Sequence, residues 1–296
     1  MIHETHMYRR LVLATGMATL IVMSACSVEH PASGRSAEQE DTESETLEEV
    51  FEDPVEKTDE VQDMIEPETT ESVSEPERSD PGTELLVTTE WLAAHAQDEG
   101  LRIVDTRKAA EYQAGHLPGA VSIPRSATFD PQKQSTVGQP AAIADLFGSR
   151  GIDESVHVVL YDEGKSTAAA RVFWTLELYG HPHVSVLDGG LVKWQAEGRE
   201  LTGAEPTVTP TTFIPRPTDL TATLDHVLEG IDEDATIALD TRSDDEWNDG
   251  RVPGAVHIEW TNNFTEGEIP VYKSLEELTA LYEGAGITKD HRVHTY

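Results

Sequence analysis

Short apolar runs alternate with helix-like stretches along the chain from residue 101 to residue 201. Helices are predicted at 141–147, from a possible N-cap at Ser166 to about Leu178, and after the turn Gly189-Gly190 through Trp194. The apolar runs predict short strands at 101–104, 120–123, 157–161 and 184–187. Strands that alternate with helices indicate an α/β fold with a mainly parallel sheet, covered by helices on both faces.

The whole pattern begins again 135 residues later, without a gap in the register. Residues 103–123 read I-V-D-T-R-K-A-A-E-Y-Q-A-G-H-L-P-G-A-V-S-I, residues 238–258 read A-L-D-T-R-S-D-D-E-W-N-D-G-R-V-P-G-A-V-H-I, and 10 of the 21 positions are identical. The same offset pairs Tyr161 with Tyr296. We therefore predict a second domain built like the first, with its first strand at 237–239. Its helix signals are two capping boxes and a stop: Ser243 with Glu246, Ser274 with Glu277, and Gly286.

The repeat divides the chain into predicted parts. Residues 85–202 form a first domain, the proline-rich residues 203–218 a linker, and residues 219–296 a second domain. The first copy continues for about 40 residues beyond Tyr161, whereas Tyr296 is the last residue of the sequence. By internal comparison we expect only the N-terminal part of the second domain to be present.

The first 25 residues have the layout of a secretory signal peptide. Arg9 and Arg10 precede an apolar run at 11–25, which is too short for a comfortable membrane span. The sequence Met-Ser-Ala-Cys that ends at Cys26 resembles the lipobox of bacterial lipoproteins, and the alternative is an ordinary cleaved signal. Cys26 is the only cysteine and the expected lipidation site. Because Ser27 is not aspartate, we expect a lipoprotein of the cell envelope, at the periplasmic face of the outer membrane.

Residues 26–84 are predicted to form a disordered acidic tether. Between residues 29 and 84 there are 21 acidic residues and three basic ones, with few aromatic residues, so this segment has too little apolar surface to fold. Residues 85–296 remain acidic, with 34 acidic and 16 basic residues. Such a surface argues against nucleic-acid binding, and we expect contact with the membrane through the lipid anchor.

The motif D-T-R-x-x-x-E-aromatic, followed by G-[HR]-[LV]-P-G-A-V, resembles the rhodanese domain. The first copy adds A-A-A-R-V-F-W from Ala168 and Y-G-H-P-H-V-S-V-L-D-G-G-L-V-K-W from Tyr179. Two copies in tandem resemble the thiosulfate/3-mercaptopyruvate sulfurtransferases. The resemblance covers about residues 85–296 and implies two rhodanese-like domains with central parallel sheets flanked by helices, the second one incomplete.

The resemblance also implies a reaction. In this family the first domain is catalytically silent, and the second carries a cysteine directly after its third strand, at the head of a loop that leads into a helix. The convergent N–H groups of such a loop and the helix dipole lower the thiol pKa. The thiolate takes a sulfane sulfur from a donor such as thiosulfate or mercaptopyruvate and passes it to cyanide or a thiol. No metal or organic cofactor is implied.

The alignment places Asp162 at the nucleophile position of the first copy. In the second copy that position directly follows Tyr296, so the polypeptide as printed is expected to be inactive. Three explanations compete: a fragment from a frameshift or incomplete gene model, a genuine truncation that leaves a binding module, and a UGA codon that encodes selenocysteine or replaces a cysteine codon. We favour an artefact or readthrough over natural truncation, because the remaining sheet would have an uncovered face and a bare edge.

Four residues of the second copy are candidates for substrate binding: Asp240, Arg242, Glu246 and Trp260. Arg242 and Glu246 also occur in the first copy, as Arg107 and Glu111, which favours a structural pair that braces the corner between strand and helix. Asp240 is expected to accept backbone N–H groups, and Trp260 fits a pocket mouth or the core equally well. His181 and His183 do not have metal-ligand spacing, so no metal site is expected. The rival functions are a non-catalytic binding module and, if the missing loop is longer, a rhodanese-fold phosphatase.

Overall fold

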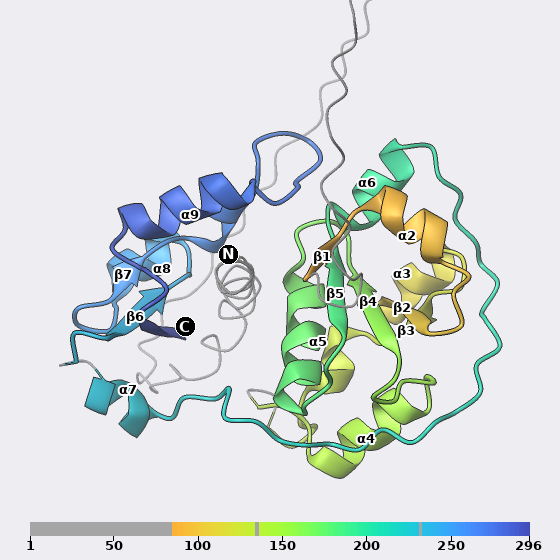
Figure 1. The fold of residues 1–296 in the computed structure, drawn as a ribbon, viewed down its shortest axis with the longest axis horizontal. Helices are drawn as coiled ribbons and strands as arrows, with labels where there is room; N and C mark the ends of the chain where they lie inside the picture. Colours follow the sequence, from red (N-terminus) through yellow and green to blue (C-terminus); the bar gives the residue numbers. More distant parts are fainter. Residues whose placement is uncertain (1–84, 134–135, 231–232) are drawn as a thin grey trace, which may run out of the picture. The chain divides into compact units, whose positions relative to one another are not determined.

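The computed structural model describes residues 85–296 except 134–135 and 231–232 (Figure 1). The predictions for the signal peptide, Cys26 and the acidic tether lie outside the described residues. Within the described part of the chain, no helix is both long enough and apolar enough to cross a membrane.

The first domain contains a five-stranded sheet in which every neighbouring pair is parallel. The strand order is β1-β5-β4-β2-β3, so β4 lies in the middle and pairs with both β2 and β5. The strands are β1 (Leu86–Val87), β2 (Leu101–Asp105), β3 (Val121–Ser122), β4 (His157–Tyr161) and β5 (Val184–Leu187). This topology confirms the predicted parallel α/β sheet.

Helices cover both faces of this sheet. Because side chains alternate along a strand, Val158 and Leu160 of β4 pack into one buried cluster, whereas Val159 and Tyr161 pack into another. The first cluster is completed by α4 and α5, and the second by α2 and α6. The helices are α2 (Thr89–His95), α3 (Ala109–Ala114), α4 (Pro140–Gly148), α5 (Thr167–Leu178) and α6 (Gly190–Ala196), with a 3-10 turn η3 (Arg125–Thr128). Figure 1 shows α5 and α6 on opposite sides of β4 and β5.

The second domain repeats the first part of this architecture. Its sheet has the order β7-β6-β8, with both pairs parallel. The pairing of Leu239 with Val256 corresponds, at an offset of 135 residues, to that of Val104 with Val121. The elements are α7 (Leu224–Gly230), β6 (Thr236–Asp240), α8 (Asp244–Asp249), β7 (Val256–His257), η4 (Trp260–Asn263), α9 (Leu275–Gly284) and β8 (Arg292–Thr295).

One face of the second sheet is less covered than its counterpart. In the first domain, Leu101, Ile103 and Val159 are buried beneath α2 and α6. The corresponding residues of the second domain are Thr236, Ala238 and His294, and all three are only half-buried. The described residues contain no counterpart of β5 or α6, and β8 pairs with β6 alone.

Several predicted boundaries are confirmed and one cap is wrong. The strands 157–161 and 184–187 occur at the predicted residues, and both capping boxes form. Ser166 does precede α5, but its hydroxyl caps nothing; the carboxylate of Asp162 accepts the N–H groups of Ala168 and Ala169 instead. The short elements β1, α2 and α7 were not predicted, because two to seven residues carry too little periodicity.

The predicted linker lies against the first domain as an extended segment. Thr211 donates its N–H to Gly148 O at 2.9 Å, and Arg216 donates to Tyr179 O at 2.8 Å. Phe213 is 5% exposed, and its ring centroid lies 5.2 Å from that of Phe147. Residues 203–218 therefore contribute a buried side chain to the first domain.

Candidate functional site

The loop that follows β4 is arranged around one carboxylate. Asp162 Oδ1 accepts the N–H groups of Gly164 at 2.9 Å and Ser166 at 3.0 Å, and Oδ2 accepts those of Ala168 at 2.9 Å and Ala169 at 3.3 Å. Ser166 has a left-handed φ of 56°, which turns its N–H toward this carboxylate. The loop is therefore an anion cradle filled by its own side chain.

The Asp162 carboxylate is deeply enclosed. The residue is 5% exposed, and burial raises the pKa of the carboxyl, while the four N–H donors act in the opposite direction. The expected silent counterpart of the nucleophile therefore lies at the carboxyl end of the central strand, where it occupies the cradle without any group that could carry sulfur.

A second cluster braces the corner between β2 and α3. The Arg107 guanidinium donates from Nε and Nη2 to the carboxylate of Asp105, and Nη2 also donates to Gly115 O at 2.7 Å. The Tyr161 hydroxyl donates to Asp105 Oδ2 at 2.6 Å and accepts the Leu117 N–H at 3.1 Å. These bonds connect the end of β4 to the first motif of the domain.

The second domain contains the same cluster. Arg242 Nη2 donates to Asp240 Oδ2 at 2.5 Å and to Gly250 O at 2.7 Å. Thr241 donates its N–H to Tyr296 O at 3.0 Å, as Thr106 does to Tyr161 O. The Val252 N–H donates to the Tyr296 hydroxyl at 2.9 Å. Tyr296 thus lies in the second domain where Tyr161 lies in the first, at the carboxyl end of a parallel strand.

The four candidate residues of the second domain separate into different roles. Arg242 pairs with Asp240 and not with Glu246, so the expected Arg242–Glu246 pair is wrong. Glu246 is instead the third residue of α8, and its carboxylate accepts the N–H and hydroxyl of Ser243. Asp240 accepts the backbone N–H of Arg242 at 3.0 Å, and it is fully buried.

Trp260 begins η4 and is half-buried. Its ring packs edge-on against Phe264 with centroids 6.0 Å apart, and the Lys165 ammonium lies 6.0 Å from its ring centroid. Trp260 is not among the residues that line the pocket described below. His181 is buried, and its ring Nε2 lies 3.0 Å from Val156 O. No group of three potential metal ligands occurs in the described part of the chain.

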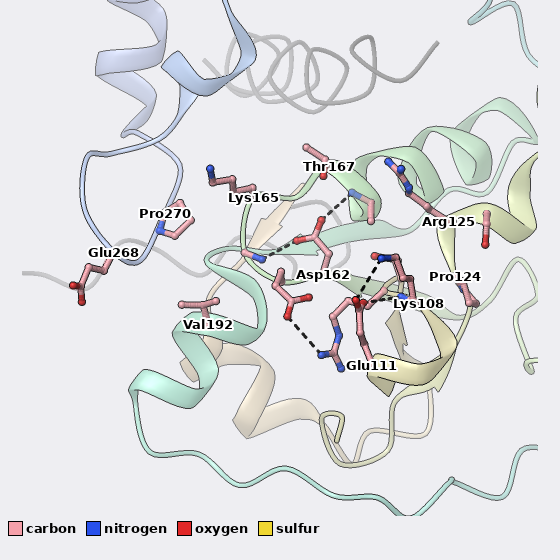
Figure 2. A pocket seen from close by; sticks show the side chains of 16 residues that line it. Lys108, Glu111, Pro124, Arg125, Asp162, Lys165, Thr167, Val192, Glu268 and Pro270 are labelled. Carbon is pink, nitrogen blue, oxygen red and sulfur yellow. Dashed lines mark hydrogen bonds and ion pairs between the residues drawn. The ribbon is translucent and has the colours of Figure 1, made fainter. Parts of the chain in front are cut away.

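A pocket of about 770 Å³ opens beside the Asp162 cradle (Figure 2). Its walls come from the loop after β2, the start of η3, the loop after β4 and the first turn of α5, together with Glu111 of α3, Val192 of α6, and Glu268 and Pro270 of the second domain. Arg125 and Lys165 line this pocket and were not among the predicted site residues. The sequence offered one signal for Arg125, since the repeat places it opposite Trp260, so the two copies differ in charge there.

These features define an α/β protein with two copies of one domain, each with the same Asp–Arg–Tyr cluster at the carboxyl end of its sheet. The family model of the rhodanese-like domain matches residues 88–197 and 223–296. The chain therefore belongs to the rhodanese family.

Its relatives include sulfurtransferases. The chain is 33% identical over 236 residues to the sulfur carrier protein TtuD of Thermus thermophilus, covering 72% of this chain and 82% of that protein. It is 29% identical to the 3-mercaptopyruvate sulfurtransferase of Escherichia coli, covering 70% and 82%. The crystal structure of the E. coli 3-mercaptopyruvate sulfotransferase SseA has a TM-score of 0.65 at 28% identity, covering 72% of this chain and 88% of that one.

Proposed function

We propose that this chain is a sulfurtransferase of the thiosulfate/3-mercaptopyruvate type, whose nucleophile belongs at the position directly after Tyr296. The observation that carries the proposal is the shared bonding of Tyr296 and Tyr161, since Asp162 follows Tyr161 at the head of the cradle. The names of the relatives support the same reaction class.

The geometry around Asp162 in the first domain supports this role. Four backbone N–H groups converge on the group that follows β4, and they would favour the anionic form of a thiol or selenol at the equivalent place. That anion attacks the sulfane sulfur of thiosulfate, the S–S bond breaks, and sulfite leaves. The resulting persulfide then transfers its outer sulfur to cyanide or a thiol, which restores the nucleophile. No metal or organic cofactor takes part in these steps.

The sequence offered four candidates for substrate binding: Asp240, Arg242, Glu246 and Trp260. Arg242 and Asp240 act mainly by bracing the corner between β6 and α8, since most of their polar atoms are engaged with each other or with Gly250 O. Trp260 remains the candidate for a direct substrate contact.

The rival function is a non-catalytic binding module. It is favoured by the pocket beside Asp162, because most of the residues that line it belong to the first domain, where aspartate stands at the nucleophile position. The two functions differ in whether any part of the protein forms a persulfide.

The test begins with the nucleotide sequence after the Tyr296 codon. Codons there for a nucleophile, a glycine-containing loop, a helix and an ending like D-G-x-x-x-W would support the proposal, and an in-frame UGA as the first of them would support the selenocysteine or point-mutation explanation. The protein extended through that codon with cysteine should form thiocyanate from thiosulfate and cyanide, whereas the matched form with serine and the chain that ends at Tyr296 should not. A long unrelated stretch after Tyr296, or robust turnover by the chain that ends there, would overturn the proposal.

We also propose export and lipid attachment through Cys26, with residues 26–84 as a tether between the membrane and the folded domains. In cells that express the full chain, fatty-acid labelling and recovery in the membrane fraction should both be lost in Cys26→Ala. Retention of the label by that variant would contradict the assignment.

A further inference from the structure

The hairpin that follows η4 in the second domain ends in a deeply buried tyrosine. Phe264 and Tyr272 pair as an antiparallel bridge, and their ring centroids lie 4.5 Å apart. The repeat places Val137 at the position of Tyr272, in a matching hairpin of the first domain that is closed by the bridge between Phe129 and Val137. Tyr272 is 7% exposed, whereas the smaller Val137 is only half-buried. The two hairpins therefore have the same pairing but differ in what covers this side chain.

Two segments of the first domain contact Tyr272. Its N–H donates to Asp188 Oδ1 at 2.9 Å. Burial raises the pKa of its hydroxyl, and the hydrogen-bonding Ser166 side chain acts in the opposite direction. Ser166 lies in the loop 162–166, and Asp188 lies in the turn 188–190. We call these two segments together the docking surface.

The loop and the turn of the docking surface lie directly against each other. A Cβ on Gly190 would be 2.7 Å from Asp162 O and 2.9 Å from Gly164 Cα, so only glycine allows this close approach. The Asp162 carboxylate fixes the loop, since it accepts four N–H groups, including that of Ser166 at its left-handed φ. The shape of the docking surface is therefore maintained within the first domain.

Further residues of the second domain lie over the same loop. A Cβ on Gly164 would be 3.6 Å from Pro270 Cγ, and Figure 2 shows Pro270 beside the loop that carries Lys165. The Lys165 ammonium lies 6.0 Å from the centroid of the Trp260 ring. Because the hairpin directly follows η4, which begins at Trp260, the position of the hairpin also determines where this ring lies.

We propose that the loop after β4, which carries aspartate at the nucleophile position, holds the second domain in place, with Tyr272 as the inserted side chain. A buried aromatic ring whose polar groups have partners is the kind of contact that dominates the energy of an interface. Tyr272 is thus a positioning residue, which acts on Trp260 through the hairpin. The proposal requires no residue after Tyr296 and no sulfur transfer.

The experiment measures ¹⁵N relaxation and hydrogen exchange by NMR in the labelled full chain. Domains that are held together tumble as one body, so the amides of β4 and β6 should give one rotational correlation time. Tyr272→Val introduces the residue that the first copy carries in its own closed hairpin. In this variant the amides of β6 should give a shorter correlation time than those of β4, and the amides at 264–272 should exchange at least about tenfold faster.

Asp188→Ala tests the other side of the contact. It removes the acceptor of the Tyr272 N–H and leaves the sequence of the second domain unchanged, so the same loosening there has to pass through the docking surface. The control Asp153→Ala also removes a carboxylate that accepts an N–H and a hydroxyl, both from Ser155. Asp153 precedes β4, at the opposite end of that strand from Asp162, so both measurements should stay within about twofold of the parent chain.

Two outcomes would overturn the inference. One is a single correlation time and unchanged exchange at 264–272 in both Tyr272→Val and Asp188→Ala. The other is equal loosening in Asp153→Ala, which would show only a general loss of stability in the first domain. The amide shifts of β4 and β6 verify that both domains are folded in each variant, and if one variant is unfolded the other decides. Because the sulfur-transfer proposal is tested on the extended protein, failure of either proposal leaves the other intact.

Discussion

The Asp162 carboxylate and the backbone of the loop that follows it form one bonded unit. Its two oxygens satisfy four N–H groups that would otherwise be buried without acceptors, and Ser166 is held at positive φ to complete the set. A loop that needs an anion for its own stability can hold either a structural carboxylate or a reactive thiolate. In the proposed mechanism, the choice of this one residue separates a silent domain from a reactive one.

Replacing that carboxylate by a thiol should reveal the latent reactivity. In Asp162→Cys, the four N–H donors should stabilise the thiolate and lower its pKa, so thiosulfate should transfer one sulfur atom to it and release sulfite. Mass spectrometry of the peptide that contains residue 162 should show the mass of one added sulfur.

Asp162→Ser is the matched control without a thiol, and Ser126→Cys places a thiol in the same pocket outside the cradle. Equal persulfide formation in Ser126→Cys would show that the cradle contributes nothing.

The buried His181 side chain makes the free energy of unfolding depend on pH. Burial lowers its pKa from 6.5 to about 4, so the unfolded chain binds a proton in this range more readily than the folded chain does. The contribution of neutral His181 to the free energy of unfolding is therefore fully present above about pH 6.5. It is lost as the pH falls toward 4, by up to about 3 kcal/mol. Urea unfolding at several pH values measures this slope. His181→Asn should flatten it, whereas His183→Gln, which changes an exposed residue, should retain it.

At the scale of elements, residues that form no helix or strand also contribute to the core. Phe213 belongs to the extended segment 203–218, but its ring packs against Phe147 and lies 6.0 Å from His181. The backbone of the same segment bonds to the ends of α4 and α5. The segment therefore acts as an outer layer of the first domain over α4 and α5.

Truncating the buried ring should detach this segment. We expect Phe213→Ala to lower the free energy of unfolding by about 3 kcal/mol and to speed proteolysis within 203–218. Ile214→Ala is the control, because Ile214 is 60% exposed, and its effect should stay within about 0.5 kcal/mol. A Phe213→Ala variant as stable as the Ile214→Ala variant would mean that the packing is not maintained in solution.

At the scale of the molecule, the two domains differ in how completely their helices and sheets are buried by neighbouring elements. Leu92 of α2 is fully buried, but at the surface of α7 Leu224 is 73% exposed and Leu228 is 55% exposed. β4 has two strand neighbours, and β8 has one among the described residues. Less burial and an unpaired edge imply easier local opening.

Hydrogen exchange should show this difference directly. In the chain that ends at Tyr296, the amides of β8 should exchange at least about tenfold faster than those of β4. The two strands occupy equivalent positions in the repeat, but β8 is less buried and pairs with only one strand among the described residues. Extension past Tyr296 with a strand and helix like β5 and α6 should slow exchange in β8 and leave β4 unchanged. Equal protection of β4 and β8 without the extension would contradict the conclusion that β8 is less buried than β4.

The sequence by itself determined the repeated α/β architecture, the register and the position of Asp162. These features depend on local patterns, since D-T-R and P-G-A-V recur at one offset and the tyrosines 161 and 296 follow the same apolar strand pattern. The capping boxes at Ser243 and Ser274 were also predictable, because a cap involves residues only three apart.

Only the tertiary structure decided which groups meet. Arg242 pairs with Asp240 and not with Glu246, because the end of β6 lies beside the guanidinium, while the first turn of α8 occupies the glutamate. Arg125 and Lys165 are separated along the chain, and no local pattern shows that they line the same pocket. The helices α2 and α7 begin at equivalent positions after Thr88 and Thr223, yet Leu92 is fully buried, whereas Val227 at the equivalent position of α7 is only half-buried. Local periodicity encodes an element, whereas burial and pairing depend on residues distant in the sequence.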